Sequence, residues 1–196
     1  HIDKFENLVR QHNAEIPVQH FVNKALLDIA LANGQTDAQL FLNQLEKIKA
    51  HQPDLMVCTC STLGAECDKD PNMHRIDQPI AAYIVQHYDR IGLAYTAHST
   101  QTISENLLLQ TSKDIGRPIE IVPIDCSAYW LFFEQENMQA YEEGIANTIL
   151  EQSSEVDVVF LAQASMAGAQ SYLQGLDKEV LTSPEYGIKT LLEKLI

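Results

Sequence analysis

The chain has 196 residues and a mass of 22.0 kDa, and its hydrophobic content of 45% can fill the core of one sizeable domain or of two small lobes. It has 13 Lys and Arg against 27 Asp and Glu, and the resulting net charge of -14 repels nucleic acid and anionic membranes. No apolar run approaches the roughly 18 residues that cross a bilayer, and no basic, hydrophobic leader opens the chain. We therefore expect a folded cytoplasmic protein without nucleic-acid or membrane partners.

The first half of the chain alternates helical and extended patterns, which predicts a parallel sheet flanked by helices. Its predicted elements are, in order, a helix over 2–12, a strand over 16–22, helices over 24–32 and 37–51, and a strand over 54–59. Thr36 or Asp37 can cap the third of these helices by accepting a hydrogen bond from its first N–H groups. Because the chain opens directly into a helix, we expect that an initial strand is absent from it.

The second half repeats this order of elements. Its predicted strands cover 91–96, 119–124, 157–162 and 179–183, and its predicted helices cover 100–113, 134–152 and 184–196. The repeated order predicts an α/β fold of two similar lobes, flavodoxin-like halves that each hold a parallel sheet flanked by helices, with a ligand cleft between them. Since we expect the last helix to return to the first lobe, we place that lobe at 1–89 plus 180–196 and the second lobe at 90–179.

Residues 54–64 form an apolar run that ends abruptly in thiols and hydroxyls. A buried strand that delivers Cys60 into a Ser/Thr turn places a titratable thiol beside free backbone N–H groups, where a carboxylate or an oxyanion can be held. The other cysteines are Cys58, Cys67 and Cys126. Their spacing is unlike that of a secreted disulfide framework, and it predicts reduced thiols.

Two further segments match this one in character. Residues 160–167 also pass from an apolar strand to small polar side chains, and Ile91-Gly92-Leu93-Ala94-Tyr95-Thr96 forms a buried strand. Taken with Cys60-Ser61-Thr62, these segments resemble the aspartate/glutamate/hydantoin racemase superfamily over most of the chain. In that family a Cys-Asn/Ser-Thr turn carries the first catalytic thiol, so the resemblance implies that Cys60 is catalytic. It also implies a small carboxylate-bearing substrate, chemistry without a cofactor or a metal, and a protein that can pair as a homodimer.

The family's second thiol lies in a Leu-Gly-Cys turn, which corresponds here to Leu161-Ala162-Gln163. Gln163 therefore stands where the second cysteine is expected. A two-base racemase needs an acid or a base on each face of the α carbon, and an amide neither gives nor accepts a proton at neutral pH. The resemblance supports the fold and the site more strongly than it supports racemisation.

Substrate binding is expected to use donors that surround a carboxylate or an enediolate. The candidate substrate-binding residues are Ser61, Thr62, Asp77, Thr96, Ser99, Gln163 and Ser165. Asp77 lies where related racemases keep an acidic residue near the cleft, although it can instead cap the helix that begins at Pro79. Gln163 can bind a substrate carboxylate, or it can satisfy buried backbone groups.

Other residues have competing interpretations. We expect Cys58 to pack in the core, and Cys126 is a weak substitute for the missing second thiol. His98 is either a general acid at the cleft or a solvated loop residue. A zinc site built from Cys58, Cys60, Cys67 and His74 is a further alternative, although the spacing lacks a Cys-x-x-Cys knuckle.

These observations predict a racemase-like isomerase that acts at the carbon α to a carboxylate, with Cys60 as the acid/base group. One alternative is a single-thiol decarboxylase or lyase of the same superfamily, which the glutamine at position 163 favours. Another is a catalytically degenerate protein that only binds a small carboxylate.

Overall fold

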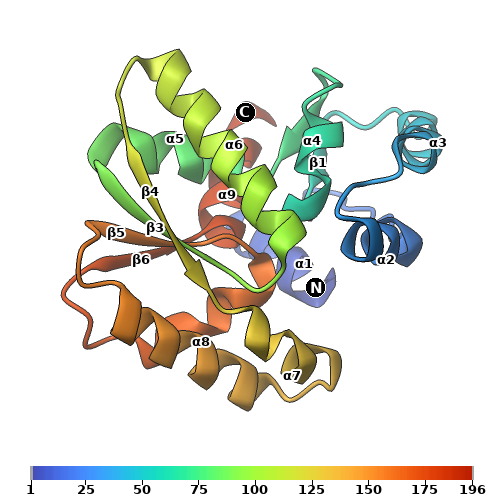
Figure 1. The fold of residues 1–196 in the computed structure, drawn as a ribbon. Coiled ribbons are helices and arrows are strands. Elements are labelled where there is room, and N and C mark those ends of the chain that lie inside the picture. Colours follow the sequence, from blue (N-terminus) through green and yellow to red (C-terminus); the bar gives the residue numbers. More distant parts are fainter. Residues whose placement is uncertain (1, 196) are drawn as a thin grey trace.

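Two parallel sheets organise residues 2–195, the part of the chain that the computed structural model describes (Figure 1). The smaller sheet pairs β1 (Met56–Cys58) with β2 (Met73–Arg75). The larger sheet has the order β4-β3-β5-β6 and consists of β3 (Arg90–Tyr95), β4 (Glu120–Asp125), β5 (Val158–Leu161) and β6 (Glu179–Thr182). The predicted α/β class with parallel sheets flanked by helices is confirmed, and the two sheets fit two lobes.

Helices connect and cover these strands. Before β1 the chain forms α1 (Ile2–His12), α2 (Lys24–Asn33) and α3 (Ala38–Lys49). Between β1 and β3 it forms the 3-10 turn η1 (Ser61–Leu63), α4 (Gly64–Cys67) and α5 (Gln78–His87). The later elements are α6 (His98–Ile115), η2 (Ser127–Tyr129), α7 (Trp130–Glu134), α8 (Met138–Gln152), η3 (Ala164–Tyr172), α9 (Ser183–Leu192) and η4 (Glu193–Leu195).

The larger sheet separates two apolar layers, because side chains along a strand alternate between its faces. Ile91 and Leu93 of β3 face α5 and α6, where they pack in one cluster with Leu108. Ala94 faces the other side and belongs to the cluster that contains Tyr141 of α8. Figure 1 shows α5 and α6 on one face of this sheet and α8 on the other. Both faces are therefore covered, as is usual for a parallel sheet.

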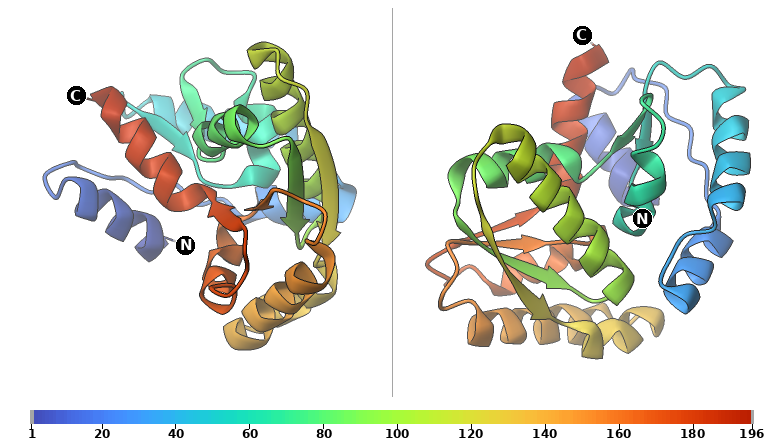
Figure 2. Two further views of the ribbon diagram at one scale, coloured as in Figure 1. Left: turned by 90° about the vertical axis from the view of Figure 1, so that its left-hand side faces the viewer. Right: turned by 45° about the horizontal axis from the view of Figure 1, so that its top comes forward.

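The smaller sheet is covered by the N-terminal helices. Leu26 of α2 and both Phe41 and Leu45 of α3 pack with Met56 of β1 and Met73 of β2. The right-hand view of Figure 2 shows α2 and α3 on the side of the molecule away from the larger sheet. These two helices therefore belong to the lobe that carries β1.

The last helix packs against the N-terminal part of the chain. Ile188 and Leu191 of α9 pack with Phe5 and Val9 of α1 and with Ile76, which follows β2. Figure 2 shows α1 and α9 side by side. Two other elements of the predicted first lobe contact the larger sheet, because α5 packs on it and β6 pairs with β5. The proposed division of the chain into lobes stays a prediction.

The strand predicted over 16–22 is wrong. Residues 13–23 form neither a helix nor a strand, and they cross from α1 to α2. Pro17 lacks the N–H group that a strand needs for pairing, and the side chain of Val22 is 71% exposed rather than buried against a core. The alternating pattern of this segment is therefore not used to build a sheet.

The helix predicted over 134–152 is interrupted. Glu136 has a φ of 58°, a left-handed backbone conformation that a continuous right-handed helix cannot contain. The side chain of Asn137 then accepts a hydrogen bond from the Ala140 N–H at 3.3 Å, and α8 begins. The structure consequently has the short helix α7 before α8.

The ends of two other helices test the sequence predictions more closely. The carboxylate of Asp37 accepts a hydrogen bond from the Leu40 N–H at 2.9 Å and caps α3, so Asp37 rather than Thr36 takes this role. The helix predicted over 184–196 is α9 followed by η4. The last residue of that prediction, Ile196, lies outside the described residues.

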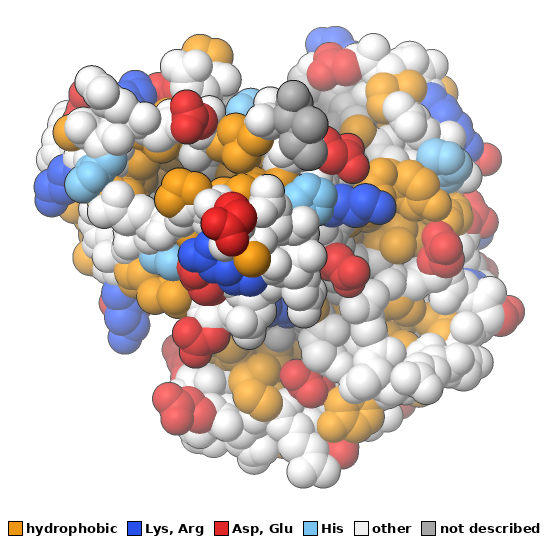
Figure 3. Space-filling view, turned by 180° about the vertical axis from the view of Figure 1, so that it is seen from behind, with side chains coloured by type: hydrophobic (Ala, Val, Ile, Leu, Met, Phe, Trp, Pro, Cys, Tyr) orange, Lys and Arg blue, Asp and Glu red, His pale blue; other side chains and the backbone are white. Residues whose placement is uncertain are grey.

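Charged side chains are distributed over the surface. On the face shown in Figure 3, the Asp and Glu side chains are scattered among hydrophobic and basic ones rather than gathered in one place. Within residues 2–195, no helix is both long enough and apolar enough to cross a membrane. The acidic side chains of that face are thus not concentrated in one patch.

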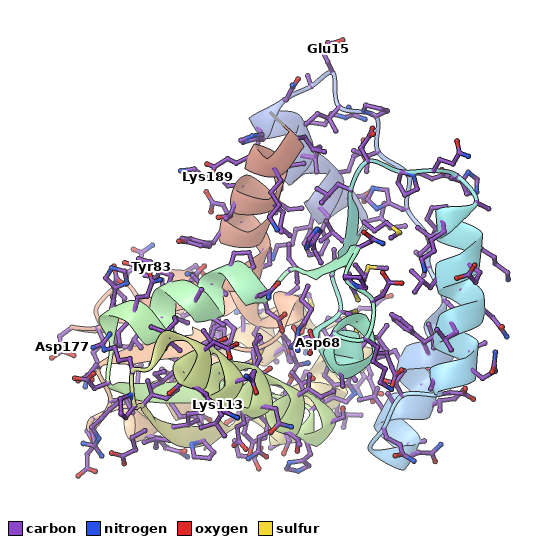
Figure 4. The ribbon with its side chains drawn as sticks, turned by 90° about the horizontal axis from the view of Figure 1, so that it is seen from above. Glu15, Asp68, Tyr83, Lys113, Asp177 and Lys189 are labelled. Atoms are coloured by element: carbon purple, nitrogen blue, oxygen red, sulfur yellow. The ribbon has the colours of Figure 1, made fainter. Side chains whose placement is uncertain are left out.

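A buried ion pair fixes β2 against the turn that follows β1. Arg75 and Asp77 are 3% and 0% exposed, and the guanidinium donates from Nε to Oδ1 at 2.8 Å and from Nη2 to Oδ2 at 2.9 Å. Nη1 donates at 2.9 Å to Asp68, which Figure 4 labels beside α4. The guanidinium also lies over Gly64, where a Cβ would come 2.3 Å from Arg75 Cζ. Two parallel hydrogen bonds offset much of the cost of burying these charges.

We expect Asp77→Ala to lower the free energy of unfolding by about 3–5 kcal/mol, because it leaves the buried guanidinium without its counter-ion. Asp68→Ala removes an exposed partner of the same guanidinium and should lower it by at most about 1 kcal/mol. Urea denaturation followed by circular dichroism measures both values. Equal losses in the two variants would contradict the structural importance of the buried pair.

Candidate functional site

Cys60 lies at the carboxyl end of β1, where the backbone leaves the strand and enters η1. Its backbone is extended, with φ -106° and ψ 106°, and the Leu63 N–H donates to its carbonyl at 3.0 Å. Cys60 is partly exposed, whereas Cys67 and Cys126 are buried. Cys60 as a residue is therefore only partly covered, although its thiol is largely buried.

Burial and hydrogen bonding act in opposite directions on the Cys60 thiol. Burial raises its pKa to about 11, and the charge of an ionised Cys58 acts in the same direction. Hydrogen bonds from the backbone of Leu63 and Thr62 and from the Thr62 hydroxyl lower the pKa, because they favour the thiolate. Burial is the larger effect, so Cys60 keeps its proton at neutral pH.

Thr62 connects the turn after β1 to the start of α6. Its Oγ1 lies 2.9 Å from Oγ1 of Thr100, and the two residues are 4% and 0% exposed. The Thr36 hydroxyl donates to the Thr62 carbonyl at 3.5 Å. The side chain beside the thiol is thus held by a second buried hydroxyl, from the first turn of α6. No sequence pattern pointed to Thr100, because a threonine in the first turn of a helix carries no signal of what it faces.

Two of the predicted substrate-binding hydroxyls are unpaired. The Oγ atoms of Ser61 and Ser99 are buried, and neither has a hydrogen-bond partner among the described residues. Ser104 and Ser183 share this property elsewhere in the fold. Ser61 directly follows Cys60, and buried polar groups are normally hydrogen-bonded. The hydroxyls of Ser61 and Ser99 therefore lack a hydrogen-bond partner within the described residues.

Gln163 follows β5, and its amide oxygen is held by the end of β3. Oε1 accepts hydrogen bonds from the Thr96 N–H at 2.8 Å, from the Ala97 N–H at 3.1 Å and from the Thr96 hydroxyl at 3.1 Å. The sequence left two interpretations of Gln163 open. The structure shows that its oxygen satisfies backbone groups, and binding of a substrate by Gln163 stays a prediction.

A chain of three hydroxyl groups extends from the contact between Thr96 and Gln163 into the core. Oγ1 of Thr96 lies 3.0 Å from Oη of Tyr141, which lies 3.0 Å from Oγ of Ser165. Because the single hydroxyl proton of Thr96 goes to Gln163, Tyr141 must donate to Thr96 and Ser165 must donate to Tyr141. Burial raises the pKa of Tyr141, so it retains the proton that this order requires. Tyr141 comes from α8, 45 residues along the chain from Thr96, and no local pattern pointed to it.

The remaining candidates lie around this site in other roles. Asp77 makes no capping hydrogen bond at the start of α5, so its interpretation as a helix cap is wrong, and both of its carboxylate oxygens contact Arg75. Its role in substrate binding stays a prediction. Cys58 packs at the edge of the smaller sheet's core, and its Sγ donates to the Cys60 carbonyl at 3.6 Å. His98 is exposed at the start of α6.

Metal ligation finds no support in the described residues. Residues 2–195 contain no group of three or more His, Cys, Asp or Glu side chains that could hold a metal ion, so the alternative zinc site does not form. Two surface pockets lie away from the thiol. One of about 300 Å³ is lined by Lys49, Asp54 and His74 among others, and one of about 160 Å³ is lined by side chains of α1 and α9. Neither of these pockets includes Cys60 or Gln163.

Cys60 should react slowly with iodoacetamide at neutral pH, because the thiolate is the reactive form. With a pKa of about 11, its alkylation rate should rise about tenfold for each pH unit between pH 7 and pH 10. Mass spectrometry measures this rate, and fragment ions separate Cys60 from Cys58. Thr62→Val removes a hydrogen bond that favours the thiolate and should slow the reaction further. An alkylation rate that levels off near pH 8 would contradict the raised pKa of Cys60.

Tyr141→Phe should break the hydroxyl chain and leave the partners of Tyr141 unsatisfied in the core. We expect it to lower the free energy of unfolding by about 1–3 kcal/mol. Tyr172→Phe is the matched control, because Tyr172 is 42% exposed, and it should change stability by at most about 0.5 kcal/mol. Chemical denaturation measures the free energy of unfolding of both variants. Similar small losses would show that the chain of hydroxyls contributes little to stability.

No family model and no curated protein matches this sequence. Solved structures with the same fold do. An aspartate racemase from Picrophilus torridus aligns with a TM-score of 0.72 at 16% identity, over 98% of this chain and 87% of that chain. A glutamate racemase isoform from Bacillus anthracis aligns with a TM-score of 0.67 at 13% identity, over 98% of this chain and 76% of that chain. An allantoin racemase from Klebsiella pneumoniae aligns with a TM-score of 0.58 at 16% identity, over 98% of this chain and 81% of that chain.

Identities this low establish similarity of fold alone. The similarity nonetheless extends over almost the whole described chain in each of these three structures. It confirms the resemblance found in the sequence: this chain has the fold shared by aspartate, glutamate and allantoin racemases.

Proposed function

We propose that the protein is a racemase-like enzyme that acts at the carbon α to a carboxylate, with Cys60 as the proton-transferring group. The observation that carries this proposal is a partly exposed cysteine at the end of a parallel strand, whose thiol is surrounded by hydrogen-bond donors. The fold shared with structures named as aspartate, glutamate and allantoin racemases supports it. Open parallel sheets bind ligands at the carboxyl ends of their strands, which is where Cys60 lies.

The unpaired hydroxyls support a carboxylate-bearing substrate. Ser61 and Ser99 each offer a buried O–H group with no partner in the described chain, next to Cys60 and next to Thr100 respectively. Such groups gain most from a ligand that accepts hydrogen bonds, and a carboxylate has acceptor sites on both oxygens. Removal of the α proton puts further negative charge on those oxygens, which the same donors would stabilise.

A single-thiol decarboxylase or lyase is the second candidate, and two observations favour it. The position of the family's second thiol holds Gln163, and Cys60 has a pKa of about 11. At pH 7 only about one Cys60 in ten thousand is then a thiolate, so this residue is better prepared to donate a proton than to remove one. In decarboxylation, a substituted malonate loses carbon dioxide, its electron pair remains as an enediolate, and the thiol protonates the carbon. Water then returns a proton to the thiolate.

A single incubation in deuterated water separates these functions. Amino acids, hydantoins and substituted malonates are offered as a panel, and proton NMR follows deuterium at the α carbon while carbon dioxide is measured. We expect deuteration of one class of compound, and Cys60→Ser should slow it at least about 100-fold, the usual contribution of a positioned acid/base group. Inversion indicates a racemase, and carbon dioxide release indicates a decarboxylase.

Cys126→Ser is the matched control, because Cys126 is the same residue type buried after β4. It should deuterate substrate at the rate of the unaltered protein once its melting temperature has been checked. Exchange that survives Cys60→Ser would remove Cys60 from the mechanism. Binding of a carboxylate without any exchange would identify the protein as a binding protein rather than an enzyme.

A further inference from the structure

The amide of Gln163 has only one possible orientation in this fold. The groups around Oε1 are two backbone N–H groups and the Thr96 hydroxyl, at 2.8–3.1 Å. An N–H group can only donate, so the atom that faces both must be the amide oxygen. The amide nitrogen, Nε2, consequently points the other way.

Nε2 of Gln163 is an unused double donor. It makes no hydrogen bond to any of residues 2–195, and it is absent from the side-chain atoms that are both buried and unpartnered. This nitrogen, at the carboxyl end of β5, is therefore neither sealed from solvent nor paired within the described residues. The chain Ser165, Tyr141 and Thr96 restrains the other side of the same amide. The result is a donor of fixed direction, as a preorganised oxyanion site requires.

We propose that Gln163 binds an anionic oxygen of the substrate through Nε2 while Oε1 stays in its cradle, the N–H groups of Thr96 and Ala97 and the Thr96 hydroxyl. This inference rests on the proposed function. It assigns a role to Gln163, which stands at the position of the family's second thiol. Gln163 then stabilises the carboxylate, or the enediolate formed from it, without exchanging a proton. Cys60 is left as the single proton-transferring group, so the hydrogen at the α carbon is delivered to one face only.

The competing possibility is that Gln163 is a plug, which a substrate carboxylate must displace from the cradle. Displacement would break three hydrogen bonds at once and release the hydroxyl chain behind them. Thr96 is only 2% exposed, so its N–H and hydroxyl would lose their acceptor in a largely dry environment. Binding at the exposed nitrogen needs none of these losses, and the geometry therefore favours it.

Gln163→Glu tests the proposal with the smallest change. A carboxylate oxygen can accept the same three hydrogen bonds, so the cradle stays satisfied, while the two N–H donors are replaced by an acceptor with negative charge. Gln174→Glu is the matched control, because it adds the same charge at an exposed glutamine after η3. Malonate is titrated as the probe into the full chain labelled with nitrogen-15. Melting temperatures verify that all proteins are folded.

We expect malonate to shift the side-chain NH₂ signals of Gln163, which are assigned by their loss in Gln163→Glu. The dissociation constant for malonate should rise at least tenfold in Gln163→Glu and change less than twofold in Gln174→Glu. Equal affinity in Gln163→Glu and the unaltered protein would overturn the proposal. So would a titration in which the backbone amides of Thr96 and Ala97 take the large shifts, because Gln163 would then be the displaced plug.

The same titration separates this inference from the proposed function. If malonate binds but Gln163 is not needed, only the role of Gln163 is wrong. If malonate, aspartate and glutamate all leave the spectrum of the unaltered protein unchanged, then carboxylate recognition itself is wrong. The inference falls with it in that case.

Discussion

Parallel pairing of β3 with β5 is the constraint on which the candidate site depends. Its register places Ala94 opposite Leu161, and two residues further along each strand Thr96 meets Gln163. The backbone ladder ends with the Ala162 N–H donating to the Ala94 carbonyl at 2.9 Å. Beyond that point the Gln163 side chain supplies the acceptor that the Thr96 and Ala97 N–H groups need. A side chain thus extends the ladder past the strands, and it holds their polar ends together where ligands of parallel sheets bind.

Elements that flank the two sheets meet close to these strand ends. The hydroxyls of Thr62 and Thr100 join the turn after β1 to the start of α6, and Ala164 packs with Ile76 in the core shared by α1 and α9. Lys4 adds a hydrogen bond from Nζ to the Ala164 carbonyl at 3.2 Å. Thr62, two residues after Cys60, and Ala164, directly after Gln163, are therefore both held by residues far along the chain. Packed elements of this kind hold functional groups in place better than loops do.

The chemistry of the two positions differs for a physical reason. Cys60 is surrounded by donors that favour its thiolate, yet burial has the larger effect and keeps it protonated. Gln163 holds its oxygen in a cradle of three donors and has no proton to exchange at neutral pH. One position can give a proton and the other can only stabilise negative charge. The site that we propose from these two residues therefore fits chemistry with a single proton carrier better than it fits symmetrical removal and return of a proton.

The sequence by itself determined the α/β class, the parallel sheets, a helix cap at Thr36 or Asp37, and the position of Cys60 at a strand end. These features follow from local patterns, such as apolar runs, polar breaks and capping residues. Tertiary structure decided the rest. The segment at 16–22 has a strand pattern but no neighbouring strand, and the partners of Thr96 lie 45 and 67 residues away at Tyr141 and Gln163. Contacts over such distances depend on how layers pack, and residue spacing along the chain carries no record of that packing.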